Sequence, residues 1–241
     1  MADRKQRRGV PYGLAALVAR PVLAGAALLA TVPANAAESA RDTLTRTAFV
    51  VQDRAAALAQ IASVESNAVA VLNRAPGDVE AQLTRAMATS YRAKLTNSRA
   101  DALAAKAQFE AITTRNPRDA EAQAALGAWH LSAVKSLGGL VARGALGARK
   151  ASGLDALDRA VALGGPRALF PGLAALLRLA LDPKDPTGAS LAETAARGAT
   201  PTALDRILQR RAVQIVATLR SGDTRGVQAL ANRLLPLGQF K

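Results

Sequence analysis

The sequence predicts an all-α fold in which antiparallel helical hairpins stack side by side as a short solenoid of about eight to ten helices. Alanine and leucine dominate the composition, and no stretch alternates apolar and polar residues as a half-buried strand does. Proline and glycine recur between long alanine-rich stretches. The segment RAPGDVEAQ at 74–82 returns as RNPRDAEAQ at 115–123, a period of 41 residues. A fixed internal period of about 20–50 residues is typical of helical repeat arrays.

The first 36 residues have the pattern of a secretory signal peptide. Four basic residues lie between positions 4 and 8, an uncharged apolar run extends from 21 to 32, and Ala34-Asn35-Ala36 matches the site that signal peptidase accepts. The alternative is a retained membrane anchor, but Arg20 leaves about a dozen apolar residues where a span needs about 20. We therefore expect cleavage after Ala36 and a periplasmic or otherwise exported protein. No later stretch has about 18 uncharged apolar residues, so no transmembrane segment is expected after cleavage.

Outside this signal the chain is strongly basic and contains no cysteine. The signal holds five of the 32 basic and one of the 18 acidic residues, so the rest of the chain has a net charge of +10. Such an excess attracts anionic partners. In an exported chain with four Phe, two Tyr and one Trp, we expect no nucleic acid. Envelope polyanions, anionic lipid heads or an acidic protein partner fit the charge better. The alternative is that arginine serves only for solubility. Without cysteine no disulfide can form, and stability depends on packing.

The first helices are bounded by proline and glycine. Residues 37–52 form a lead-in that holds a short helix or another ordered stretch. A helix follows over 53–74, with an apolar stripe that begins at Ala57. It stops at Pro76-Gly77, because proline cannot continue a helix and glycine permits the turn.

The repeated segment explains how the next helices begin. Asp78 and Asp119 can cap helix N-termini, and Glu80 and Glu121 suit first turns because the helix dipole favours negative charge there. We therefore interpret the repeated segment as a structural joint whose charged residues are not a binding site. The helices are expected at 78–95, 99–114 and 120–137.

A glycine-rich and basic stretch interrupts the series after residue 137. Gly138-Gly139 loosens the preceding helix, and 140–152 is either a frayed helix or an ordered loop. The helices of 167–241 are expected to pack on the array and cap it with a polar outer face. From residue 153 onward the expected helices are 153–163, 167–181, 188–197, 200–219 and 224–234.

The residues at one joint resemble the tetratricopeptide repeat family. Ala105, Phe109, Ile112 and Pro117 match the small, aromatic, apolar and proline positions of its second helix and closing turn, and Leu126-Gly127 matches the Leu-Gly pair of the next first helix. The period of 41 residues exceeds the family's of about 34, and the first copy lacks the Leu-Gly pair. The resemblance implies a divergent repeat array. The resulting domains are a signal at 1–36, the lead-in at 37–52, repeats at 53–166 and C-terminal helices at 167–241.

A second resemblance covers 126–163. Gly127-Ala128-Trp129, followed by the basic connector at 138–150, is similar to the bacterial relatives of the family called regulator of microtubule dynamics. The resemblance implies that the connector belongs to the fold. Microtubule binding does not carry over to an exported chain.

Catalytic and metal chemistry find little support in the sequence. His130 is the only histidine, and a single His cannot supply the two or more His or Cys ligands of a usual metal site. Trp129 is expected to fill space between helices. The glycines near 138–147 lack the strand and the Gly-Lys-Ser/Thr ending of a phosphate loop. We expect no catalytic residue, no metal and no cofactor.

The basic connector is the candidate binding region. Lys135, Arg143, Arg149 and Lys150, together with His130, could hold an acidic peptide, although a solvated basic connector is the plainer interpretation. We therefore expect an exported, non-enzymatic protein that binds a partner protein or peptide as a scaffold or adaptor. The alternative is a periplasmic small-ligand-binding accessory of a solute transporter.

Overall fold

The structure, a computed structural model, describes residues 34–240, with side chains from residue 40 onward. These residues belong to one compact unit, Pro33–Lys241. The predicted signal lies outside the described residues except for its last three positions, which begin the first helix.

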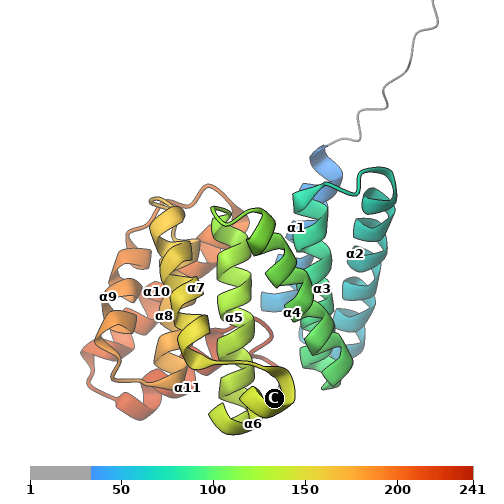
Figure 1. The fold of residues 1–241 in the computed structure, drawn as a ribbon. Coiled ribbons are helices and arrows are strands. Elements are labelled where there is room, and N and C mark those ends of the chain that lie inside the picture. Colours follow the sequence, from blue (N-terminus) through green and yellow to red (C-terminus); the bar gives the residue numbers. More distant parts are fainter. Residues whose placement is uncertain (1–33, 241) are drawn as a thin grey trace, which may run out of the picture. The chain divides into compact units, whose positions relative to one another are not determined.

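Residues 34–240 are all-helical, which confirms the all-α prediction, and within this range there are eleven helices and no strand (Figure 1). The number exceeds the eight to ten expected because the connector contributes a helix of its own. In chain order they are α1 (Ala34–Phe49), α2 (Arg54–Arg74), α3 (Val79–Thr96), α4 (Arg99–Arg115), α5 (Ala120–Leu137), α6 (Gly139–Leu146), α7 (Lys150–Leu163), α8 (Leu169–Leu181), α9 (Pro186–Ala196), α10 (Ala203–Arg220) and α11 (Thr224–Leu234).

The repeated segment forms the same joint twice. Asp78 and Asp119 each cap a helix, accepting hydrogen bonds from the backbone N–H groups of Ala81 at 2.9 Å and Ala122 at 3.0 Å. The repeated Gln side chain donates to the carbonyl of the repeated Pro in both copies, at 2.7 Å and 3.1 Å. The helices that follow, α3 and α5, each contain 18 residues. The expected capping is therefore confirmed.

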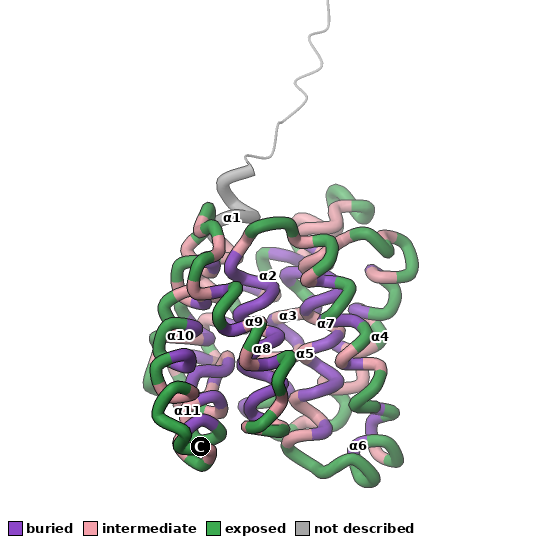
Figure 2. The backbone as a smooth tube through the Cα atoms, turned by 90° about the vertical axis from the view of Figure 1, so that its left-hand side faces the viewer, coloured by how far each residue is buried: buried purple, intermediate pink, exposed green. Residues whose placement is uncertain are grey.

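Helix α5 packs most extensively against α7, which is not its immediate successor. The two helices approach closely because Gly127 and Gly153 have no side chain. A Cβ on Gly127 would lie 2.9 Å from the carbonyl oxygen of Gly153 and 2.8 Å from Cγ of Leu157. Helix α6 lies between α5 and α7 in the sequence but at the lower edge of the array in space (Figures 1 and 2). Helix α6 therefore belongs to the connection between α5 and α7 and does not separate these two packed helices.

Helix α2 is the one helix among the described residues that is long and apolar enough to cross a membrane by length and composition. Its buried residues, among them Ile61 and Val64, form one stripe, and it packs against α1 and α3. Beside this stripe Glu65 forms an ion pair with Arg92 of α3. One apolar stripe beside a charged position is typical of an outer helix in a helical protein.

The last described residues bind to the first helix. The N–H of Leu237 donates to the carbonyl of Ala48 at 2.7 Å, and the Gln239 amide donates to the carbonyl of Val51 at 2.9 Å. The Arg211 guanidinium lies 4.3 Å from the centre of the Phe49 ring, a cation–π contact. The segment 235–240, called the C-terminal segment below, thus contacts the end of α1, and Arg211 joins α10 to the same end.

Candidate functional site

The two glutamates of the repeated segment converge on one arginine. Arg41 of α1 donates through Nε to Glu80 at 2.7 Å and also forms an ion pair with Glu121. Burial alone would lower the pKa of Arg41, but the charges of Glu121 and Glu80 leave it above its usual value. The sequence interpretation of these glutamates is therefore incomplete. They lie in first turns as expected, and they also connect α1, α3 and α5.

A second arginine extends this network to α10. Arg167, in the turn before α8, forms ion pairs with Glu121 at 2.9 Å and Asp205 at 3.2 Å. Asp205 is fully buried and also accepts from the N–H of Leu169 at 3.0 Å and the hydroxyl of Thr202 at 2.7 Å. A buried carboxylate is stable only when paired and hydrogen-bonded in this way.

The network borders a hollow of about 330 Å³. Its walls carry charges of both signs, and its floor is apolar. Arg167 lies over the ring of Phe170 at 5.2 Å from the ring centre. The residues that line the hollow are Glu80, Leu83, Asp119, Ala120, Glu121, Leu163, Gly164, Arg167 and Phe170.

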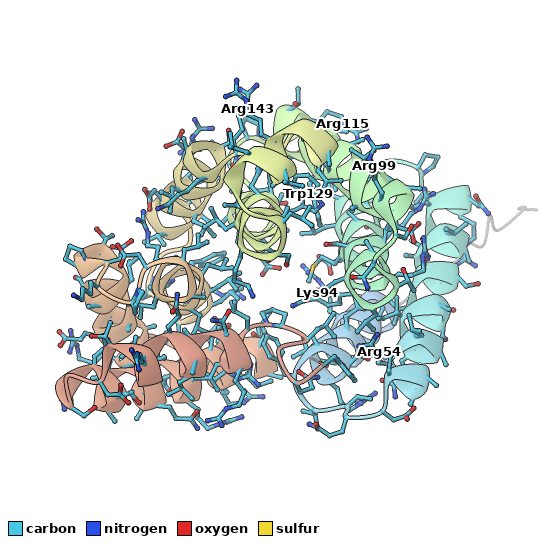
Figure 3. The ribbon with its side chains drawn as sticks, turned by 90° about the horizontal axis from the view of Figure 1, so that it is seen from below. Arg54, Lys94, Arg99, Arg115, Trp129 and Arg143 are labelled. Atoms are coloured by element: carbon cyan, nitrogen blue, oxygen red, sulfur yellow. The ribbon has the colours of Figure 1, made fainter. Side chains whose placement is uncertain are left out.

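The other end of the same two helices carries a pair of lysines. Lys94 and Lys135 are 41 residues apart and so occupy the same position in α3 and α5, in the last turn of each. Burial among protein atoms, together with the charge of Lys135, lowers the pKa of Lys94 to about 8. By its solvent-accessible surface Lys94 is exposed, although many protein atoms surround its ammonium, which donates to the carbonyl of Pro236 in the C-terminal segment. Figure 3 shows it pointing into the region between α3, α5 and that segment.

Between these two ends α3 presents a stripe of larger side chains. Met87 accepts a hydrogen bond from Arg41 at 2.7 Å, and burial raises the pKa of Tyr91 to about 12 although the charge of Arg41 opposes this. With Glu80 and Lys94 these residues lie at helical spacing, so they share one side of α3. We call this side of α3, together with the side of α5 that carries Glu121 and Lys135, the inner face.

The residues that the sequence predicted as one binding region lie in different places in the structure. Lys135 belongs to the inner face, whereas Arg143, Arg149 and Lys150 are exposed along α6 and the start of α7. His130 is 5% exposed, and its Nδ1 accepts the N–H of Arg149 at 3.3 Å. Burial first, and then the charge of Lys106, lower the pKa of His130. Its ring holds the connector against α5 and is not presented at the surface.

The sequence left open whether the connector is a frayed helix or an ordered loop. In the structure it forms a short helix, α6, followed by a turn. Helix α6 ends at Gly147, which has φ of 67°, a backbone conformation that favours glycine. Trp129 is buried as expected, and its Nε1 donates to the carbonyl of Ala102 at 3.0 Å. Within residues 34–240 no group of three or more His, Cys, Asp or Glu is placed to hold a metal ion.

Sequence reasoning missed Arg41, Lys94 and the joint use of the two glutamates. A signal was available, because the 41-residue period continues past the repeated segment and aligns Lys94 with Lys135.

Comparison of the chain with protein-family models, curated proteins and solved structures finds no match.

Proposed function

We propose that the chain is an exported, non-enzymatic, tetratricopeptide-like repeat protein that binds an acidic segment of a partner protein on its inner face. Two features support the repeat assignment. The joint at 74–82 recurs in sequence and in hydrogen bonding at 115–123, and each joint opens a helix of equal length. Stacked helical repeats create extended concave surfaces that bind ligands.

The observation that carries the proposal is the pairing of Lys94 with Lys135. Lys94 and Lys135 lie in the last turns of α3 and α5, and the charge of Lys135 adds to burial, the larger cause, in lowering the pKa of Lys94. Repulsion between these two like charges costs free energy in the absence of an anion. A carboxylate placed between them would remove this repulsion and regain favourable Coulomb energy. The two glutamates place negative charge at the other end of the same helices, where they hold Arg41. The lysine end carries one positive charge on each helix and is therefore the part of the inner face that attracts an added anion.

The geometry also suggests how a segment would be positioned. On α3, Tyr91 lies one turn from Lys94, and Met87 lies one turn further, beside Arg41. Both are partly exposed and would offer that remaining surface to the side chains that flank an acidic residue. Peptide recognition by helical arrays combines such apolar contacts with charge complementarity. The charge pair would then set the register of the bound segment.

A double substitution of Lys94 and Lys135 with methionine should weaken binding of an acidic probe. We expect the dissociation constant for oligo-L-glutamate, measured by isothermal titration calorimetry at low salt, to rise by about tenfold or more, because hydrogen bonds between charged groups contribute about 1.5–3 kcal/mol. Methionine keeps the length and apolar stem of lysine.

The matched control, which also removes two positive charges, replaces Lys184 and Arg197 with methionine, since both are exposed and lie outside the inner face. The control should bind the probe with the affinity of the unmodified chain apart from a small general charge effect. Equal weakening by the control and by the double variant would show that only net charge attracts the probe, and the proposal would fail.

The hollow beside Arg167 favours a second candidate, a small-ligand-binding protein. Its volume of about 330 Å³ and its paired charges suit a zwitterion such as an amino acid. A thermal-shift panel of amino acids separates the two candidates. Stabilisation that is lost in Phe170→Leu and kept in the Lys94/Lys135 double variant would favour the small-ligand candidate.

A further inference from the structure

The strongest feature outside the inner face is a cluster of exposed aliphatic side chains at helix α6. Leu140 is 89% exposed, Val141 57% and Leu137 43%. Leu140, Val141 and Gly144 share one side of α6, while Ala142 and Leu146 on its other side are buried. We call Leu137, Leu140 and Val141 the α6 tip. Helix α6 lies at the lower edge of the array, and most of its length is exposed (Figure 2).

The surroundings of the α6 tip are cationic. The sequence has no Asp or Glu between Glu121 and Asp155, and this interval contributes the exposed Arg143, Arg149 and Lys150. From α4, Arg99 donates to the carbonyl of Ala145 at 3.1 Å. Helix α6 thus presents exposed aliphatic side chains, and basic residues of α6, α7 and α4 surround them.

Lys106 adds a further positive charge, with its Nζ 3.6 Å from the position that a Cβ of Gly147 would take. Glu110 pairs with Lys106 at 3.0 Å. The exposed arginines of the rim are not part of that ion pair.

We propose that the α6 tip docks the protein on an anionic membrane surface. A bilayer interface accepts aliphatic side chains from a projecting edge without a complementary cavity, and anionic headgroups attract the surrounding cations. A protein partner would need a matching apolar groove as well as negative charge. Leu140 and Val141 lie on α6, Leu137 is the last residue of α5, and none of the three belongs to the inner face. The proposal uses neither Lys94 nor Lys135, so it is independent of the proposed function.

The test places a fluorophore at the tip of the full chain. Leu140→Trp should fold normally because the position is 89% exposed. On vesicles of phosphatidylglycerol and phosphatidylcholine its emission should shift to the blue and should be quenched by brominated lipid. Val213→Trp is the matched control, because Val213 is 52% exposed on α10. Its emission should not change.

Substitution should then separate the apolar and charged contributions. Val141→Asp in the Leu140→Trp background should weaken the partitioning read out at the tip by about tenfold or more, whereas Val213→Asp should leave it unchanged. Replacing Arg143 with Gln should weaken it by about fivefold on anionic vesicles and little on neutral ones. Gly144→Leu, which adds a side chain where no atom lies within 4 Å, should strengthen it.

Three outcomes would overturn the proposal. The first is unchanged Leu140→Trp emission on anionic vesicles. The second is an equal response from Val213→Trp, which would indicate non-specific adsorption. The third is a blue shift caused by oligo-L-glutamate but not by vesicles, which would assign the tip to an acidic protein. Because none of these readouts involves Lys94 or Lys135, failure here leaves the inner-face experiment unaffected.

Discussion

Replacing Asp205 with alanine should lower the free energy of unfolding by about 2–5 kcal/mol, because it leaves the buried N–H of Leu169 without its acceptor and removes one of the two carboxylates that hold Arg167. The Asp205 side chain is fully buried and is held by Arg167, the N–H of Leu169 and the hydroxyl of Thr202. Its loss would release the start of α10 and the turn before α8 together. Urea unfolding followed by circular dichroism measures the change.

The control for Asp205 is Asp155→Ala, since Asp155 is exposed on α7. Substitution of such a surface position should change stability by no more than about 0.5 kcal/mol. A loss of less than about 1 kcal/mol in Asp205→Ala would show that the buried network contributes little to stability. The ion-pair network would then not be what joins α1, α5 and α10.

Replacing Gly127 with alanine should destabilise the fold by about 1–3 kcal/mol, although alanine is the better helix former by about 1 kcal/mol. A Cβ at this position meets a backbone carbonyl of α7 at 2.9 Å, which cannot move without shifting the helix. The same urea measurement applies.

Gly144→Ala is the matched control for Gly127, because it introduces the same group in a helix where no atom lies within 4 Å. It should leave stability unchanged or raise it by up to about 1 kcal/mol. The prediction fails if both alanine variants shift stability in the same direction, since the close approach of α5 and α7 would then not be required.

The helices were largely predictable from the sequence because local chemistry determines them. Asp78 and Asp119 cap helices in isolation, and Pro76 ends one whatever its surroundings. The expected bounds of α2, α3, α4 and α5 therefore agree closely with the structure. Helix α7 begins at Lys150 and not at Gly153, because Gly153 serves the contact with Leu131 and not a helix start.

The inner face was less predictable because it depends on contacts between distant residues. Nothing local indicates that Arg41 reaches across 80 positions to Glu121, or that the C-terminal segment supplies a carbonyl to Lys94. Both glutamates have a sufficient local explanation in the helix dipole, and this explanation concealed their second role. The basic residues of 135–150 were identified by composition, but composition could not show that Lys135 faces α3 while Arg143 faces solvent.

The pKa of Lys94 gives the most direct test of the inner face. Protonated Lys94 is the form that attracts a carboxylate. Binding should therefore weaken as the pH rises through about 8, the pKa of the Lys94 side chain in the protein without a bound anion. By linkage the bound anion should raise that pKa towards the usual lysine value. We expect an NMR titration of the Lys94 side chain to give a pKa of about 8 alone and a clearly higher value with oligo-L-glutamate. A pKa that oligo-L-glutamate leaves unchanged would contradict the account.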